Sequence, residues 1–192
     1  KGLSLMSKKP LPCLSYLLAK QNLIGKPISA VNVSFKISPV LNAAGRMGEP
    51  ETALELLLTD EPGKIEDLTD RLLSLNAARQ QNEEDTMKMV SSKAEDSYID
   101  NDGKIVIIDD PSVPRGLTGS IASRISNDKR IPVIVLATMD GKVSGSMRCH
   151  DPWSARDFLS SFSHLLEDYG GHRFAAGFRL DEEKKAEFIA RV

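Results

Sequence analysis

The sequence predicts an α/β protein, with a mixed-sheet C-terminal domain flanked by helices and a long helix joining it to a mostly helical N-terminal segment. Three observations lead to this fold class. Leucines recur at helical spacing in the first sixty residues. The stretch from Lys64 to about Tyr98 contains neither glycine nor proline. After Gly103, short buried-strand patterns alternate with helical ones, which is typical of helices packed on a sheet.

Two helices and an irregular connection are expected in the N-terminal segment. After Pro10 and Pro12, leucines at near-helical spacing predict a helix that Gly25-Lys26-Pro27 ends; they are Leu14, Leu17, Leu18 and Leu23. A second helix over Glu51 to Leu58 places four apolar side chains on one face: Ala53, Leu54, Leu57 and Leu58. Because Pro39 and Gly45 interrupt it, the segment from Val31 to Met47 is expected to be irregular.

The longest predicted element is the helix that follows. Its apolar stripe consists of Ile65, Leu68, Leu72, Leu75, Ala78, Met87, Val90 and Ala94. A helix of about 34 residues is roughly 50 Å long, which exceeds the width of a small domain, so we expect it to connect two domains. Two helices broken near Gln80 to Glu84, where the stripe lapses, are the alternative.

The C-terminal part predicts four strands and three helices. In chain order these are a strand at Lys104–Ile108, a helix at Gly116–Ser126, strands at Pro132–Ala137 and Lys142–Met147, a helix at Ser154–Leu166, a strand at Phe174–Leu180 and a helix from Glu182. Asp140-Gly141 between the second and third strands is a typical two-residue hairpin turn.

Composition restricts the class of protein only weakly. The net charge of -2 excludes a uniformly basic nucleic-acid binder, so any positive site must be local. Residues 60–100 carry eleven acids and five bases, a balance of -6, whereas residues 103–179 carry ten bases and eight acids, a balance of +2.

Two distant cysteines, Cys13 and Cys149, indicate reduced thiols and a cytoplasmic location. No apolar run is long enough to span a bilayer, so we expect no membrane partner. Lys1 as first residue and a helical pattern running to Val192 suggest part of a longer protein.

The first candidate binding element is Gly170-Gly171-His172. Adjacent glycines let the backbone approach a ligand closely, their N–H groups form a concave anion site, and His172 adds a side-chain donor. A plain Gly-Gly turn before a strand, with His172 on the surface, explains the same residues.

Two arginines of the C-terminal part are further candidates. Arg148 follows Gly145 at the end of a predicted strand, and its planar guanidinium suits a phosphate. Arg115 precedes a glycine-containing turn at a helix start, where free N–H groups attract anions. The alternatives are an exposed arginine at a strand end and glycines that allow tight packing of helix on sheet.

A third candidate lies in the N-terminal segment. Asn42 and Arg46 belong to a run of small residues that we expect to present them to a ligand from a loop. An ordinary connection between helices is the alternative.

We predict no catalytic and no metal-binding residue in this chain. Metal-assisted phosphodiester hydrolysis needs clustered carboxylates and usually histidines, but the histidines at 150, 164 and 172 are scattered. Asp109-Asp110 at a strand end has no second acidic pair, and such carboxylates usually cap turns.

These motifs together resemble RecJ-like single-stranded-DNA-specific exonucleases of the DHH phosphoesterase superfamily. The resemblance covers nearly the whole chain in the right order. It rests on Asn42-Ala43-Ala44-Gly45-Arg46 followed by Met47-Gly48, on Leu75 to Gln80, on Gly145 to Arg148, and on the GGH-x-x-AAG pattern of Gly170 to Gly177.

The resemblance implies a division of the chain into three parts: residues 1–62 as the end of the DHH catalytic domain, 63–99 as a connecting helix, and 100–192 as the DHH-associated substrate-binding domain. It also implies Mn²⁺ or Mg²⁺ in the full-length parent and none bound by this chain. The expected partner is single-stranded DNA or short oligonucleotides, and the oligomeric state is left open. A phosphodiesterase for short oligonucleotides or cyclic dinucleotides and an inert nucleic-acid-binding module are the alternatives.

Overall fold

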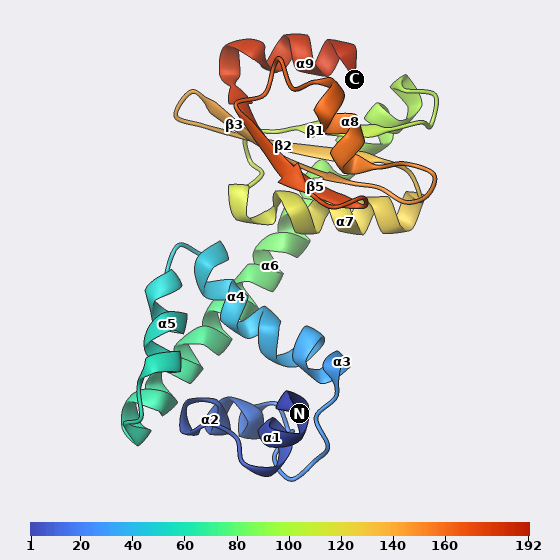
Figure 1. The fold of residues 1–192 in the computed structure, drawn as a ribbon. Helices are drawn as coiled ribbons and strands as arrows, with labels where there is room; N and C mark the ends of the chain where they lie inside the picture. Colours follow the sequence, from blue (N-terminus) through green and yellow to red (C-terminus); the bar gives the residue numbers. More distant parts are fainter. The chain divides into compact units, whose positions relative to one another are not determined.

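The computed structural model describes all of residues 1–192, and the chain forms two compact units, Lys1–Asn82 and Glu83–Val192. The first unit is helical and the second contains a sheet with helices on both sides (Figure 1). Helix α6 (Pro62–Asp100) contributes its first half to one unit and its second half to the other.

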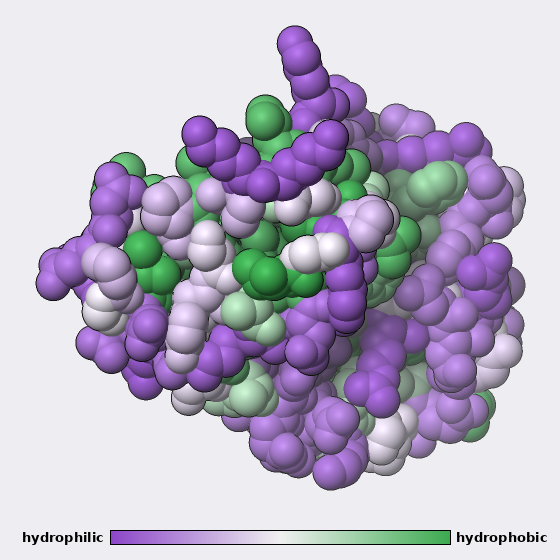
Figure 2. Space-filling model, turned by 90° about the horizontal axis from the view of Figure 1, so that it is seen from below, coloured by the Kyte–Doolittle hydropathy of each residue, from purple (hydrophilic) through white to green (hydrophobic).

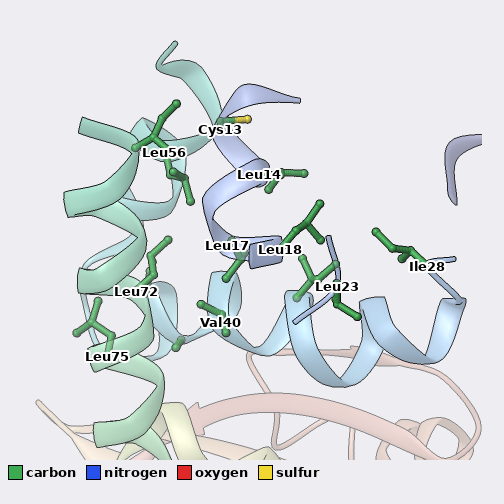
Figure 3. Packing of buried hydrophobic residues seen from close by; sticks show 14 residues of the cluster. Cys13, Leu14, Leu17, Leu18, Leu23, Ile28, Val40, Leu56, Leu72 and Leu75 are labelled. Atoms are coloured by element: carbon green, nitrogen blue, oxygen red, sulfur yellow. The ribbon is translucent and has the colours of Figure 1, made fainter. Parts of the chain in front are cut away.

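The first unit is built from short helices around a leucine-rich core. Its elements are α1 (Gly2–Lys8), α2 (Pro12–Lys20), α3 (Ala30–Asn32), a π-helical turn (Val33–Ile37), α4 (Ser38–Arg46), α5 (Pro50–Leu58) and the start of α6. Leu17, Leu56 and Leu72 are fully buried where α2, α5 and α6 meet (Figure 3). The predicted helix after Pro12 is confirmed but ends at Lys20, and Leu23 is buried beyond its end.

The prediction that residues 31–47 are irregular is wrong, because the segment is helical almost throughout. Pro39 lies in the first turn of α4, where a missing N–H breaks no helical hydrogen bond. Val40, Ala43 and Ala44 form the buried face of α4. That burial offsets the low helix propensity of Gly45.

The helix predicted over residues 51–58 is confirmed as α5, but of the four apolar residues on its predicted face only Ala53 packs against the core. Leu56 is the fully buried residue of α5, whereas Leu54, Leu57 and Leu58 are exposed. Other large hydrophobic residues of the first unit are exposed as well, among them Leu11 and Phe35. Figure 2 shows hydrophobic side chains among the hydrophilic ones on the face it presents.

Helix α6 is a single helix of 39 residues, so the alternative of two helices broken near Gln80 is wrong. At 1.5 Å per residue it is roughly 58 Å long. The stripe lapses between Gln80 and Glu84, but these positions hold Gln, Asn and Glu, none of which breaks a helix. Ala78 of the predicted stripe is exposed.

The second unit is a five-stranded mixed sheet in the order β1-β2-β3-β5-β4. Its strands are β1 (Val106–Asp109), β2 (Val133–Met139), β3 (Lys142–Arg148), β4 (Asp168–Gly171) and β5 (Ala175–Asp181). Only β1 and β2 are parallel. Asp140 and Gly141 both have positive φ, at 52° and 73°, which confirms the predicted hairpin.

Helices cover both faces of the sheet (Figure 1). On one side, α7 (Thr118–Lys129) and the end of α6 pack on β1 and β2 through Ile121, Val90 and Val135. On the other side, α8 (Ala155–Ser161) and α9 (Lys185–Arg191) pack on the strands through Leu159 and Phe188. Two 3-10 turns, Arg115–Leu117 and Glu182–Lys184, lead into α7 and α9. The mixed α/β fold class is confirmed.

Two details of the second unit differ from the sequence prediction. The helix expected over residues 154–166 is shorter than predicted: it is α8, which ends at Ser161 and has Ser154 as its N-cap. Strand β4 was not predicted, because its four residues, Asp-Tyr-Gly-Gly, include two glycines and lack the alternation with buried positions that marks a strand. Pairing with β5 along one edge makes it a strand.

Both cysteines are free and buried. Burial raises the pKa of the Cys13 and Cys149 thiols above their ordinary value. No helix of the chain combines the length and apolar character needed to cross a membrane.

Candidate anion-binding surface

Alternation along β3 divides its side chains between the two faces of the sheet. Val143 and Met147 are buried on the side of α8 and α9. Ser144, Ser146 and Arg148 are half-buried and face the side of α7. The polar face of β3 therefore lies beside the start of α7.

Arg148 is held in place by several hydrogen bonds. Its Nε donates to Ser123 Oγ at 3.1 Å, and its Nη1 donates to the carbonyl oxygens of Met147 at 2.8 Å and Ala176 at 3.4 Å. An added Cβ at Gly119 would lie 2.8 Å from Arg148 Nη2, so glycine is needed there for the guanidinium to lie against α7. The guanidinium is thus positioned before any ligand arrives.

Small residues surround Arg148 on this face. Ser146 is paired with Gly177 on β5, and Gly177 with Gly170 on β4, so all three share the α7 side. Ser146 Oγ lies 3.0 Å from Thr118 Oγ1. A Cβ at Gly170 would meet no atom within 4 Å, and one at Gly177 would meet only the Gly145 carbonyl oxygen, at 3.7 Å. We call this open face, formed by Ser144, Ser146, Arg148, Gly170 and Gly177, the Arg148 surface.

The other two predicted glycines are required by packing. A Cβ at Gly145 would lie 2.1 Å from the Phe178 ring, which covers this residue on the α8 side. Gly171 has φ +145°, and a Cβ there would lie 2.4 Å from the Ala175 carbonyl oxygen. The alternative of a Gly-Gly turn is wrong in its position, because both glycines lie in β4 and the turn begins at His172, which is on the surface as that alternative expected.

His172 is exposed in the turn between β4 and β5. Its backbone N–H donates to the Ala175 carbonyl at 2.8 Å. The turn is held to the start of α8 and the loop before it. Ala155 N–H donates to the Arg173 carbonyl at 2.6 Å, and Arg173 forms an ion pair with Asp151 at 2.6 Å. The His172 side chain is therefore presented by an anchored turn.

Arg115 lies toward the opposite end of β3 from Arg148. It lines a pocket of about 240 Å³ together with Ser144 and Arg179, both of which face the α7 side. Lys142 and Glu167 also line this pocket and form an ion pair with each other. The structure thus places Arg115 and Arg148 at two ends of one sheet face.

Asn42 and Arg46 belong to the first unit and lie on α4, not on a loop. Both are exposed. Because they are four residues apart, they lie on the same side of the helix, opposite its buried face.

Sequence reasoning missed the α7 residues Thr118 and Ser123 and, on α8, Arg156. Ser146 was in the quoted motif but not among the candidate residues. The alternation of Ser144, Ser146 and Arg148 with buried residues is the signal that could have found it. No sequence signal places Ser123 next to Arg148, because 25 residues separate them.

The acidic pair at the end of β1 is engaged in separate ion pairs. Asp109 binds Lys185 of α9 at 3.0 Å, and Asp110 binds Lys93 of α6 at 2.6 Å. Hydrogen bonds from Lys93 and then from Ser112 lower the pKa of Asp110 to about 2. No group of three or more His, Cys, Asp or Glu residues in the chain is arranged to hold a metal ion.

Comparison with known proteins identifies the domain family of the second unit. Residues 102–192 match the family model of the DHHA1 domain, so the sheet that carries the Arg148 surface is a DHHA1 domain of the DHH superfamily. The single-stranded-DNA-specific exonuclease RecJ of Thermus thermophilus is 41% identical over 169 residues, which are 88% of this chain and 24% of that protein. RecJ of Escherichia coli is 32% identical over 181 residues, which are 90% of this chain and 31% of that protein.

Solved structures agree over nearly the full chain. The crystal structure of Thermus thermophilus RecJ in complex with Mn²⁺ has a TM-score of 0.84 at 38% identity and covers 99% of this chain and 28% of that one. Exonuclease RecJ bound to manganese has a TM-score of 0.76, also at 38% identity, covering 99% of this chain and 46% of that one. The chain therefore belongs to the RecJ-like proteins of the DHH superfamily. It spans about a quarter to a third of the length of the curated relatives it matches most strongly.

Proposed function

We propose that this chain is the substrate-binding part of a metal-dependent exonuclease that hydrolyses phosphodiester bonds of single-stranded DNA. The observation that carries the proposal is the fixed guanidinium of Arg148 on an open face of small residues. Relatives named as single-stranded-DNA-specific exonucleases support the substrate class.

Arg148 supplies the main phosphate contact in this proposal. Its planar guanidinium is already oriented by the hydrogen bonds described above, and a charge-assisted bond from a guanidinium to a phosphate is stronger than a neutral one. Ser146 Oγ lies on the same face, two residues earlier on β3, and is held by its hydrogen bond with Thr118 Oγ1. The bare glycines at 170 and 177 let a sugar-phosphate backbone come close to the sheet.

The other predicted residues have supporting roles in the proposal. Arg115 contacts the strand at the far end of the same face, and His172 contacts it from the anchored turn. Asn42 and Arg46 contact the substrate from the first unit. All are contacts to phosphate or sugar, which position a strand without reading its sequence.

Catalysis belongs to the full-length parent in this proposal, since the relatives solved with Mn²⁺ and Mg²⁺ are much longer chains, of which this one covers 28% and 29%. We expect the 192 residues alone to hydrolyse nothing when Mn²⁺ is added. Metal-dependent hydrolysis by the purified chain would contradict this division of labour.

The binding role is tested by fluorescence anisotropy with a fluorescein-labelled oligothymidylate. Arg148→Ala is expected to weaken binding by about tenfold or more, since charged hydrogen bonds contribute about 1.5–3 kcal/mol. The matched control is Arg124→Ala. Arg124 is an exposed arginine of α7 that lies on the side of the helix away from Gly119 and Ser123.

Two outcomes would favour another function. Equal affinity of wild type and Arg148→Ala would overturn the assignment of the Arg148 surface. Tight binding of a dinucleotide or a cyclic dinucleotide, with no gain for a longer strand, would favour the phosphodiesterase for short oligonucleotides instead.

A further inference from the structure

A groove lies on the other side of strand β4 from the Arg148 surface. Two adjoining pockets, of about 650 and 460 Å³, share Arg156, Asp157 and Gly171. The first is also lined by Ser160, Tyr169 and Gly170, and the second by Pro152, Ser154, His172 and Arg173. We call this feature the α8 groove, because α8 forms one wall and β4 with its following turn forms the other.

Arg156 is the free cation of the α8 groove. It is exposed at the start of α8 and lines both pockets. The structure gives it no hydrogen bond and no ion pair, whereas Arg173 at the end of the groove is paired with Asp151. An exposed arginine in a concave site keeps its donors available for an incoming anion.

Tyr169 adds an aromatic face to the same groove. Tyr169 pairs with Phe178 in the sheet, so the Tyr169 side chain is on the α8 side. The residue is 36% exposed. Aromatic side chains of this kind stack on the bases of single-stranded nucleic acids without sequence preference. Asp157 lines both pockets as well, and its carboxylate weakens the attraction of the groove for a phosphate, so Arg156 is the group that must supply that attraction.

The Arg148 surface and the α8 groove meet at strand β4. Gly170 faces the Arg148 surface through its partner Gly177, and it also lines the α8 groove. β4 is the edge strand, paired only with β5, so no further strand blocks the way from one face to the other. A Cβ at Gly170 would meet nothing within 4 Å, so the passage is not obstructed there.

We propose that the α8 groove is a second nucleotide subsite, in which Arg156 binds a phosphate and Tyr169 stacks on a base of a single strand that passes around the free edge of β4 from the Arg148 surface. The inference rests on the proposed function, since it adds a subsite for the same substrate. It predicts that affinity grows when the strand is long enough to reach from one face to the other. Arg156 and Tyr169 then contribute to the affinity only for strands that are long enough to reach the α8 groove.

The test compares a dinucleotide with an oligothymidylate of about 12 nucleotides, which is within the range that single-strand sites cover. Arg156→Ala is expected to weaken binding of the long strand about three- to tenfold and to leave the dinucleotide unchanged. The slope of log affinity against log salt for the long strand should fall by about 0.7, the value for one phosphate contact to a single strand. Tyr169→Ala should also weaken the long strand, whereas Tyr169→Phe should retain binding.

Controls separate this inference from the proposed function. Arg148→Ala should weaken both probes and Arg124→Ala neither, and unfolding curves should show that the exposed Arg156→Ala variant is folded. If Arg156→Ala binds the long strand as the wild type does, or weakens both probes equally, the second subsite is overturned. If Arg156→Ala weakens the long strand while Arg148→Ala weakens nothing, the groove is retained and the assignment of the Arg148 surface is overturned.

Discussion

Gly170 and Gly171 are adjacent in one motif, yet we expect substitution by alanine to destabilise the protein at Gly171 and to leave its stability nearly unchanged at Gly170. A Cβ at Gly171 would lie 2.4 Å from the Ala175 carbonyl oxygen and 2.5 Å from Ala176 Cα. Both atoms are backbone of β5, so no side chain can move aside. A Cβ at Gly170 would meet nothing within 4 Å.

The magnitude for Gly171→Ala follows from two costs. Its φ of +145° is a conformation that alanine rarely adopts, which costs about 1–3 kcal/mol. Relieving the overlap with β5 adds about 1–3 kcal/mol. We therefore expect a loss of about 2–6 kcal/mol in the free energy of unfolding, with β4 displaced from the sheet. Gly170→Ala should stay within about 1 kcal/mol of the wild type.

Urea denaturation followed by circular dichroism measures both variants, and oligothymidylate binding adds a second readout. Gly170→Ala should fold normally but bind more weakly, because its methyl group projects onto the Arg148 surface. A difference between the two variants below about 0.5 kcal/mol, the usual effect of a neutral surface substitution, would refute the packing argument for Gly171.

Two further predictions concern stability. Asp110→Asn should cost on the order of 1–2 kcal/mol at neutral pH, because the ion pair with Lys93 and the Ser112 bonds hold the pKa of Asp110 near 2 instead of 3.8. Since a lowered folded-state pKa stabilises above the unfolded pKa, the wild-type advantage should shrink as pH falls from about 4 toward 2, and a pH-independent difference in urea denaturation would contradict this. Gly145→Ala should cost about 1–3 kcal/mol because its Cβ would overlap the Phe178 ring, and adding Phe178→Leu should recover part of that loss; strictly additive losses would count against it.

Local chemistry made much of the fold predictable. The hairpin at Asp140-Gly141 needs positive φ at both residues, and this pair of residues is suited to it. The absence of helix breakers between Lys64 and Tyr98 correctly predicted one long helix. In both cases the determining interactions are within a few residues along the chain.

The errors lie where local signals pointed away from the tertiary outcome. Pro39 and Gly45 suggested an irregular segment, but the packing of Val40, Ala43 and Ala44 makes it helix α4. For the same reason Asn42 and Arg46 are on a helix. Leu54, Leu57 and Leu58 have helical spacing, yet spacing alone does not say which side of α5 faces the core.

The sequence by itself determined the fold class, the long helix and the residue types of the candidate site, because composition, periodicity and turn chemistry act locally. Only the tertiary structure decided that the space beside Gly170 is open, whereas the space beside Gly145 and Gly171 is filled by neighbouring parts of the chain. It also brought Ser123 to Arg148 and left Arg156 unpaired beside Tyr169. These arrangements depend on sheet pairing between segments far apart in the chain, and no local pattern encodes that pairing.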